Sequence, residues 1–250
     1  MTLISAHRCG VGDNRNLENT KEGILAVLDT DVDYVEFDVQ LTEDGIMVLH
    51  HDPIVFDCGH MVNIRDITYA HLLEIIPDIL TYEEALGLLS GRAGAHIDFK
   101  FTSPSYSVAS STFEAAGTAT AHSIMGEGNY IVTSEIDDSI WATTQWAKQM
   151  GVDVMAGLSI GKTTKGMGTW DAFMTRQADS NPFWRYRDCG ANLVVSNHVL
   201  AKNCFHERIG LPLLVWTVNS EEDIRRWMGE AWMITTDYPE RALHVRGSVN

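Results

Sequence analysis

Residues 34–49, YVEFDVQLTEDGIMVL, are the stretch on which the fold assignment depends. The first half of this stretch alternates apolar and polar residues, a pattern typical of a β-strand with two different faces. Glu36 and Asp38 share one of these faces, because side chains two positions apart on a strand point the same way. The Asp-Gly pair at 44–45 is a strong hairpin signal. We therefore expect residues 40–50 to form a β-hairpin that stands above this strand.

The expected hairpin also sets a register. Pairing across a turn centred near Asp44 places His51 level with Asp38. In that register an imidazole would return to the neighbourhood of the two acids.

Short apolar runs recur along the chain and are separated by helix-like stretches. The expected strands are 3–6, 34–39, 95–99, 130–133, 152–156, 193–195, 213–218 and 232–235. The clearest helical patterns are 20–28, 82–89, 139–150 and 221–228, with Asp138 and Ser220 at positions where N-caps are expected. Eight strands that alternate with helices predict parallel βα units, and eight units fit a closed barrel. The sequence thus predicts an α/β fold, a single (β/α)8 TIM barrel over residues 1–250 with a β-hairpin extension after strand two.

The composition limits the possible partners. The chain has 250 residues and a formal net charge of −16, which argues against affinity for nucleic acid or for an anionic membrane surface. No window approaches the ~20 apolar residues that a membrane span needs, and the N-terminus lacks the pattern of a secretory signal. We therefore expect a cytoplasmic protein with no stable membrane insertion, and we expect its four cysteines to be free thiols.

Acidic residues gather where the predicted strands end. Asp98 and Lys100 share a strand face, as Glu36 and Asp38 do, and the carboxyl ends of barrel strands form the face where active sites sit. If these faces point into the barrel, three carboxylates converge. Such a group is unfavourable without a cation, and three oxygen ligands suit one divalent ion, Mg²⁺ or Ca²⁺.

Basic and titratable groups lie close to these acids in the predicted fold. His7 and His51 are candidates for proton transfer, because a neutral imidazole has a pKa near working pH. Arg8 and Lys100 are candidates for binding phosphate. A bound cation and these two side chains would reconcile an acidic chain with an anionic substrate. A solvated strand end with scattered charges is the alternative interpretation, and three acids at matched strand positions favour the site.

Several blocks of the sequence resemble the glycerophosphodiester phosphodiesterase family in order and spacing. The blocks are AHR at 6–8, ENT at 18–20, EFDVQLTEDG at 36–45, HDP at 51–53, IDFK at 97–100, VWTVN at 215–219 and TDYP at 236–239. The resemblance covers about positions 4 to 240, and the first fifty residues carry its most specific part. Residues 101–190 resemble no pattern that we can assign.

The resemblance implies a barrel enzyme that hydrolyses a small phosphodiester, such as a glycerophosphodiester, to an alcohol and sn-glycerol 3-phosphate. It implies a divalent metal held by Glu36, Asp38 and the acid at position 98. It also implies His7 and His51 as the general acid/base pair. The same resemblance places Arg8 and Lys100 near the phosphate, gives Glu18 a supporting role, and places Trp216 at the substrate pocket.

Two positions depart from the family pattern. Cys9 stands between Arg8 and Gly10, where the family usually has glycine directly after the arginine. The third acid is Asp98, where glutamate is common, a choice shared with sphingomyelinase-D-like relatives on the same barrel. The head group that the site accepts is therefore open.

Two other functions remain open from the sequence. A lysophospholipase D or sphingomyelinase-D-like activity would need apolar surface at the barrel mouth, from residues such as Met167, Trp170, Phe173, Phe183 and Trp184. A catalytically inactive binding barrel is disfavoured by the intact set of candidate residues.

We expect residues 159–168 to form a loop over the barrel mouth, where Lys162 and Lys165 could approach an anionic substrate. The glycine spacing at 157–163 does not match a phosphate-binding loop.

Overall fold

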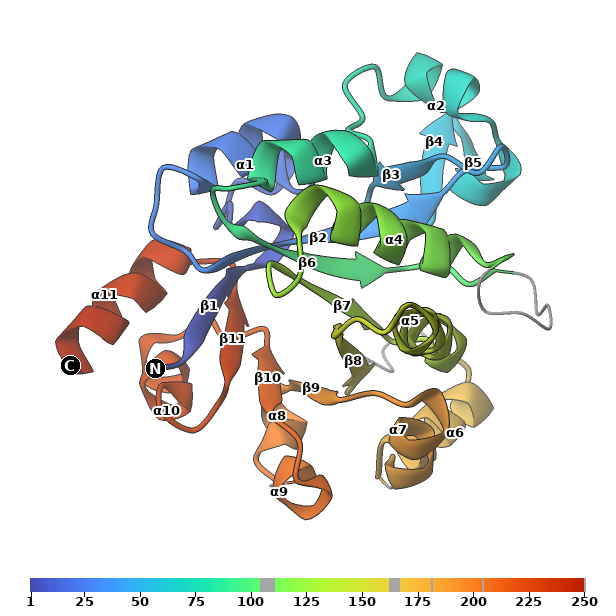
Figure 1. The fold of residues 1–250 in the computed structure, drawn as a ribbon. Coiled ribbons are helices and arrows are strands. Elements are labelled where there is room, and N and C mark those ends of the chain that lie inside the picture. The colour runs from blue at the N-terminus through green and yellow to red at the C-terminus, as the bar shows by residue number, and fades with distance from the viewer. Residues whose placement is uncertain (104–110, 162–166, 181, 204, 250) are drawn as a thin grey trace.

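The computed structural model describes residues 1–103, 111–161, 167–180, 182–203 and 205–249, and Figure 1 shows its fold. The strands are β1 (Leu3–Ala6), β2 (Tyr34–Leu41), β3 (Met47–Leu49), β4 (Ile54–Asp57), β5 (His60–Asn63), β6 (Gly94–Phe99), β7 (Tyr130–Ser134), β8 (Met155–Ile160), β9 (Leu193–Asn197), β10 (Leu213–Trp216) and β11 (Met233–Thr236). The α-helices are α1 (Lys21–Val27), α2 (Tyr69–Ile75), α3 (Tyr82–Leu89), α4 (Phe113–Met125), α5 (Asp137–Met150), α6 (Thr169–Ser180), α7 (Phe183–Cys189), α8 (His198–Ala201), α9 (Phe205–Ile209), α10 (Glu221–Trp227) and α11 (Pro239–Val249). Short 3₁₀ helices span His7–Cys9, Arg15–Leu17 and Ile64–Asp66.

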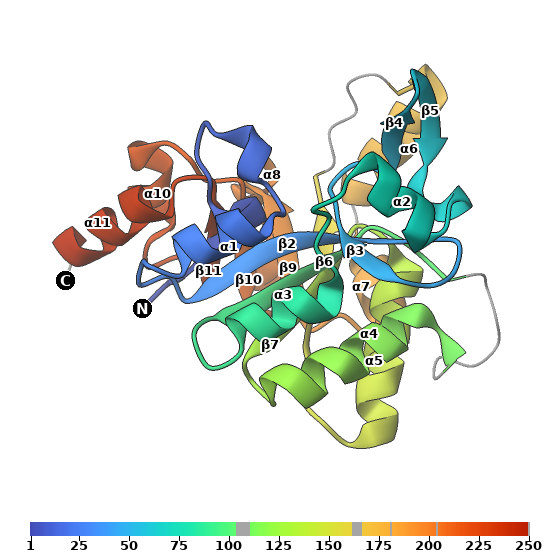
Figure 2. The ribbon, with the colours of Figure 1, turned by 90° about the horizontal axis from the view of Figure 1, so that it is seen from above.

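The strands form a closed parallel barrel. The order β1-β11-β10-β9-β8-β7-β6-β2 returns to β1 through the β1–β2 pairing, and every pair in this ring is parallel. Helices follow the barrel strands along the chain and surround the barrel, as the two orthogonal views show (Figures 1 and 2). The predicted TIM barrel is therefore confirmed.

Strand parity separates two apolar regions. Val35, Phe37 and Val39 on β2 are fully buried and belong to the large cluster between the barrel and its helices. A separate cluster from the other face of the strands fills the lower interior: Ile131, Leu193, Val195, Leu214 and Met233. Above it the interior becomes polar, because the residues that alternate with Val35, Phe37 and Val39 include Glu36 and Asp38.

The predicted hairpin after strand two is present, but its register differs from the prediction. Leu41 pairs with Met47 and Val39 with Leu49, and the backbone N–H of His50 donates to the carbonyl of Asp38 at 3.1 Å. The position level with Asp38 is thus His50 and not His51. The cause is a five-residue turn, which the backbone N–H of Thr42 closes by donating to the carbonyl of Ile46 at 3.0 Å.

Two other predicted details were wrong. The fifth barrel strand was predicted at 152–156, whereas β8 spans Met155–Ile160, so the strand extends into the stretch that was assigned to a loop. Lys162 and Lys165 lie outside the described residues.

Of the two predicted N-caps, Asp138 does not cap a helix, because α5 begins at Asp137 with Ile136 at the N-cap position. The Ser220 prediction is confirmed, since its side chain accepts from the backbone N–H of Asp223 at 3.1 Å.

A small insertion stands on the barrel between β3 and α3. It contains the antiparallel pair β4–β5 and the helix α2 around its own cluster of buried residues: Val48, Val55, Ile64, Ile67, Leu72 and Ile79. Figure 2 shows β4, β5 and α6 rising on the same side of the barrel. The insertion begins directly after His51, Asp52 and Pro53, which line the cavity in the barrel interior.

Candidate active site

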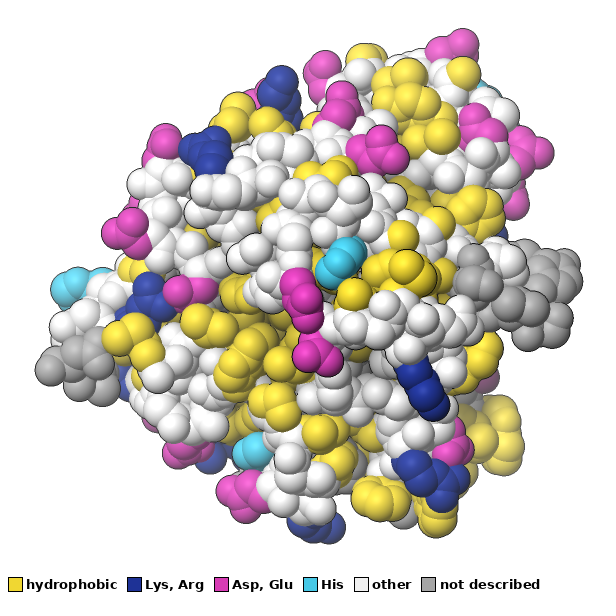
Figure 3. All heavy atoms as spheres, in the orientation of Figure 1, with side chains coloured by type: hydrophobic (Ala, Val, Ile, Leu, Met, Phe, Trp, Pro, Cys, Tyr) yellow, Lys and Arg dark blue, Asp and Glu magenta, His cyan; other side chains and the backbone are white. Residues whose placement is uncertain are grey.

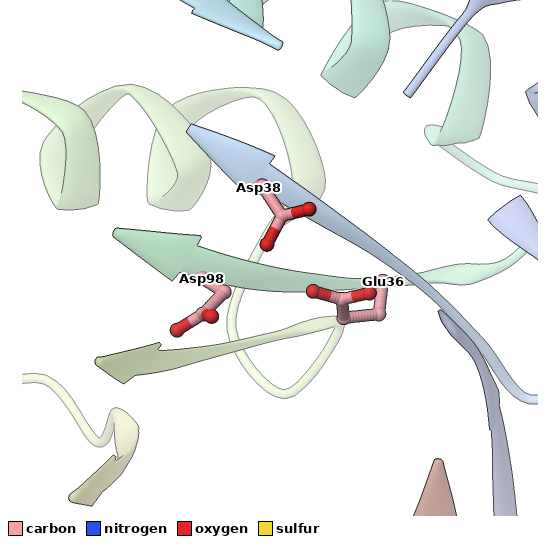
Figure 4. Close-up of side chains that lie close together, drawn as sticks. All are labelled: Glu36, Asp38 and Asp98. Carbon is pink, nitrogen blue, oxygen red and sulfur yellow. The ribbon is translucent and has the colours of Figure 1, made fainter. Parts of the chain in front are cut away.

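Three acidic side chains converge at the upper end of the barrel interior. Glu36 and Asp38 come from β2 and Asp98 comes from the paired strand β6, where Asp38 and Asp98 stand level. One ligand oxygen from each residue lies within 4.8 Å of the others, and Figure 4 shows the three carboxylates facing a common space. Their exposed fractions are 3%, 1% and 14%. The convergence predicted from strand parity is therefore present.

Two cations lie against these acids. The Lys100 ammonium is 3.0 Å from an oxygen of Asp38 and pairs still more closely with Asp98. The Arg8 guanidinium lies 3.3 Å from Asp38 and donates to Glu18 at 3.1 Å. The residues predicted from the sequence, Arg8, Lys100 and Glu18, thus belong to one connected cluster, in which Glu18 accepts a hydrogen bond from Arg8.

The charges in this cluster are unevenly compensated. Burial opposes ionisation of Asp38, but Lys100 and Arg8 outweigh burial and hold the pKa of this carboxyl well below its usual range. Burial and the neighbouring Asp38 raise the pKa of Glu36 to about 7, and the nearby His7 and Lys100 offset them only in part. The negative charge of Glu36 is therefore less well compensated than that of Asp38.

His7 directly follows β1 and pairs with Asp237, which directly follows β11. Its Nδ1 is 2.6 Å from an Asp237 oxygen. Burial opposes a charged imidazole, but the bond to Asp237 and the nearby Glu36 outweigh burial and raise the pKa of His7 above its ordinary value. Asn219 fixes Asp237 in turn, through 2.7 Å and 2.9 Å hydrogen bonds to its side chain and its backbone. This arrangement leaves Nε2 as the ring nitrogen of His7 that is free of the bond to Asp237.

His51 lines the same cavity and comes from the segment that follows the β2–β3 hairpin. Its side chain is 39% exposed and its Nδ1 lies 2.7 Å from Asp52. The side-chain amide of Gln40 donates to the backbone carbonyl of His51 at 3.0 Å, which fixes the segment after the hairpin. His7 and His51 therefore both line the cavity that contains the acids, although the predicted register was off by one residue.

The loop after β1 has an unusual backbone. Arg8, Cys9 and Gly10 all have positive φ, at 46°, 72° and 64°, and left-handed backbone is costly for residues other than glycine. This turn aims the backbone N–H of Arg8 at Glu36, 2.6 Å away. The departure at Cys9 is accommodated by burying its side chain at 1% exposure.

The cavity above the acids has a volume of about 700 Å³. Trp216 lines it from β10, and Ser159 and Asn197 line it from β8 and β9. The sequence placed Trp216 at the substrate pocket, and the structure brings it to the wall that faces the acids across the barrel.

Sequence reasoning gave no role to four partners of the site, of which the first three are buried and the last is half-buried: Asn19, His96, Asp237 and Asn219. The Asn19 side chain donates to Asp38 at 2.9 Å and accepts from its backbone N–H at 3.0 Å. His96 was left without context in the sequence, yet it shares a strand face with Asp98 and lines the cavity floor. The same parity that selected Asp98 and Lys100 could have found it.

Among the described residues, no helix is both long and apolar enough to cross a membrane.

The fold and the site together define a class: a (β/α)8 barrel with an acidic, metal-type site beside basic groups at the carboxyl ends of its strands. Comparison with known proteins is more specific. Residues 7–241 match the model of the glycerophosphoryl diester phosphodiesterase family, and this chain belongs to that family.

Individual proteins resemble this chain over different lengths, and the solved structures among them show the likeness of the fold. A glycerophosphocholine phosphodiesterase of Eremothecium gossypii is 34% identical over 91 residues, which are 34% of this chain and 7% of that much longer protein. A glycerophosphodiester phosphodiesterase structure from Parabacteroides distasonis has a TM-score of 0.72 at 16% identity, covering 99% of this chain and 98% of that one. An Oleispira antarctica phosphodiesterase in complex with the product sn-glycerol 3-phosphate has a TM-score of 0.68 at 17% identity, covering 98% and 96%.

Proposed function

We propose that this chain is a metal-dependent phosphodiesterase that hydrolyses glycerophosphodiesters to an alcohol and sn-glycerol 3-phosphate. The observation that carries the proposal is the convergence of three acids, two cations and two histidines on one cavity. The product named for the Oleispira antarctica relative supports the choice of substrate class. We further propose that residues 1–250 act as one barrel domain.

The acidic cluster fits one divalent cation, Mg²⁺ or Ca²⁺. Glu36, Asp38 and Asp98 offer only oxygen ligands, which these hard cations prefer. The raised pKa of Glu36 marks a place where a further positive charge would be stabilising. When bound, such an ion would neutralise negative charge on the phosphate during the reaction.

Arg8 and Lys100 are proposed to bind the non-bridging phosphate oxygens. Both side chains are largely buried, at 20% and 24% exposure, and burial strengthens their interaction with an anion. Glu18 would orient Arg8, and Trp216 would contact the alcohol part of the substrate from the facing wall.

His7 and His51 are proposed to transfer the two protons that the reaction requires. Breaking a phosphodiester needs a nucleophile that is deprotonated and a leaving alkoxide that is protonated. The pKa of His7 is raised, so at neutral pH it holds a proton more often than an ordinary histidine does. We therefore propose His7 as the acid and His51 as the base.

A substrate panel tests the reaction. Full-length protein supplemented with Mg²⁺ or Ca²⁺ is incubated with glycerophosphocholine, glycerophosphoethanolamine, glycerophosphoglycerol and the matching lysophospholipids, and the released alcohols are identified. We expect free head-group alcohol and sn-glycerol 3-phosphate from the glycerophosphodiesters. If no member of the panel is cleaved while the protein is folded and binds metal, the proposed reaction is wrong.

One observation favours a second candidate, hydrolysis of lysophospholipids. The aromatic residues predicted near the mouth are exposed in the structure: Trp170 at 70%, Phe173 at 50%, Phe183 at 46% and Trp184 at 55%. Hydrophobic side chains gather over α6 and α7 at the lower right of Figure 3. This surface could bind an acyl chain, and cleavage of the lysophospholipid members of the panel would support that activity.

A further inference from the structure

A chain of three buried polar side chains lies beneath the acids. Ser5 on β1, His96 on β6 and Thr133 on β7 have exposed fractions of 0%, 3% and 2%. The Ser5 hydroxyl is 2.9 Å from His96 Nδ1, and His96 Nε2 is 3.1 Å from the Thr133 hydroxyl. The Thr133 hydroxyl lies 3.0 Å from Asp98 Oδ1. The chain thus runs along one side of the barrel interior, from β1 past β2 to β6 and β7, and ends on one of the three acids.

The chemistry of the end group gives this chain a direction. An ionised carboxylate only accepts, so the Thr133 hydroxyl donates to Asp98. The Thr133 oxygen is then free to accept from His96 Nε2–H. His96 Nδ1 in turn accepts from the Ser5 hydroxyl. One assignment of hydrogens therefore satisfies every group, and it requires a neutral imidazole with its hydrogen on Nε2.

Such a layer is unusual for a barrel interior, which is ordinarily filled by branched apolar side chains. Directly across the interior, Val195 and Leu214 follow the ordinary pattern. Burying three polar groups is costly unless each is hydrogen-bonded, and packing alone would be served by apolar residues. The polar layer is therefore explained by the group on which it ends.

Asp98 is held from two sides. Thr133 binds Oδ1, while the Lys100 ammonium pairs with Oδ2. The ring of His96 and the hydroxyl of Thr133 are themselves fixed by their neighbours, so Oδ1 has little freedom to rotate. Partners that hydrogen-bond a metal-binding carboxylate fix its orientation and tune its affinity.

We propose that Ser5, His96 and Thr133 form a positioning relay that orients Asp98 for the divalent cation, with His96 and Thr133 as positioning residues. The relay rests on the metal site proposed above. Loss of such a partner typically weakens metal binding about 10- to 100-fold. The turnover at saturating metal should change less than the metal concentration needed for half-saturation.

The relay is tested by titrating Ca²⁺ into the metal-stripped protein and measuring the dissociation constant by calorimetry. Thr133→Val keeps the shape and removes the donor to Asp98, so its dissociation constant should rise about 10-fold or more. Thr133→Ser keeps a hydroxyl and should retain most of the affinity. Thr118→Val is the matched control, because Thr118 is fully buried but its hydroxyl donates to a backbone carbonyl in α4, at 2.7 Å.

A second pair of variants tests His96 independently. His96→Gln can still present an amide donor toward Thr133, whereas His96→Leu cannot. We expect His96→Leu to weaken calcium binding by about the same factor as Thr133→Val, and His96→Gln to weaken it less. Thermal unfolding of each variant identifies any that fail to fold. If the His96 variants fail to fold, the Thr133 variants still test the relay.

The outcomes separate the two proposals. If the wild-type chain binds neither Ca²⁺ nor Mg²⁺, the metal site is wrong and the relay falls with it. If the wild type binds and folded Thr133→Val and His96→Leu bind equally well, the metal site stands and the relay is refuted. A loss of affinity in Thr118→Val as large as that in Thr133→Val would also refute it.

Discussion

The two halves of the barrel wall differ in chemistry. The half formed by β11, β1, β2 and β6 contributes His7, Glu36, Asp38, Asp98 and Asp237, joined by hydrogen bonds and ion pairs. The facing half, from β8 to β10, contributes Ser159, Asn197 and Trp216 to the cavity, and its outer helices α6 and α7 expose aromatic side chains. Under the proposed function, the first half would perform the reaction and the second half would shape the space for the substrate's alcohol.

The largest effect is expected from removing a cation in the reactive half. Lys100→Met keeps length and removes the charge that pairs with Asp38 and Asp98. The loss should be about 3 kcal/mol or more of transition-state stabilisation, roughly 10²-fold in kcat/KM. Steady-state kinetics on glycerophosphocholine measure it. Lys148→Met, an exposed change on α5, is the control, and wild-type turnover in Lys100→Met would refute the assignment.

The histidines should give the next largest effects. His7→Ala and His51→Ala should each reduce kcat about 10²-fold or more on ordinary substrates, because each removes one proton transfer. A phosphodiester whose leaving group is nitrophenolate needs no acid to protonate that group. Such a substrate should restore activity to His7→Ala and leave His51→Ala inactive. The reverse pattern would exchange the two assignments. Near-normal activity of both variants on ordinary substrate would exclude the two-histidine mechanism.

Asp237→Asn should act through the pKa of His7. Removing the carboxylate removes the hydrogen bond and the charge of Asp237 that raise this pKa and leaves only Glu36 to raise it, so the limb of the pH–rate profile that reports His7 should move to lower pH. If His7 is the acid, the alkaline limb moves; if it is the base, the acidic limb moves. An unchanged profile would show that Asp237 does not control His7.

The same pair predicts a pH-dependent contribution to stability. The raised pKa of His7 gives stability that is complete below its ordinary pKa of 6.5 and is lost as pH rises through the folded value. The lowered pKa of Asp237 gives stability present above 3.8 and lost as pH falls through its folded value. The difference in unfolding free energy between wild type and Asp237→Asn should therefore be largest between about pH 4 and 6.5. Urea unfolding at several pH values measures it, and a difference that is constant across pH would contradict the pairing.

The smallest effect is expected in the facing half. The double change Trp170→Ala and Phe173→Ala on α6 removes exposed apolar surface and touches none of the reactive groups. Activity on glycerophosphocholine should stay within about twofold, since surface changes of this kind have small effects. Activity on lysophosphatidylcholine, if the panel reveals it, should fall. An equal loss on both substrates would contradict the division between the halves.

The same division limits what could be predicted from sequence. In the reactive half, the alternation at 34–39 and 95–99 was enough to place Glu36, Asp38 and Asp98 on one surface, because strand parity is a local property. The eight barrel strands were found because their short apolar runs are also a local feature of the sequence. The boundaries of β8 were misplaced, since a continuous apolar run does not mark where a buried strand begins.

Contacts between segments that are distant along the chain could not be predicted from the sequence. Asp237 meets His7 across 230 positions of sequence, and Asn219 meets Asp237 only because β10 and β11 are neighbours. The β4–β5 pair was missed because its two-residue turn is Cys58-Gly59, with φ of 48° and 86°, and not the usual Asn-Gly. The hairpin register was wrong by one residue because the sequence does not fix the number of residues in the turn.

Dependence on a divalent cation is the central claim, and chelation tests it most directly. The full-length protein is stripped exhaustively with chelator, its residual metal content is measured, and release of sn-glycerol 3-phosphate from glycerophosphocholine is followed before and after adding Mg²⁺ or Ca²⁺. We expect no turnover in the stripped protein and recovery on adding back the ion, with Asp98→Asn needing more ion than wild type. Full turnover after complete removal of metal would contradict the account.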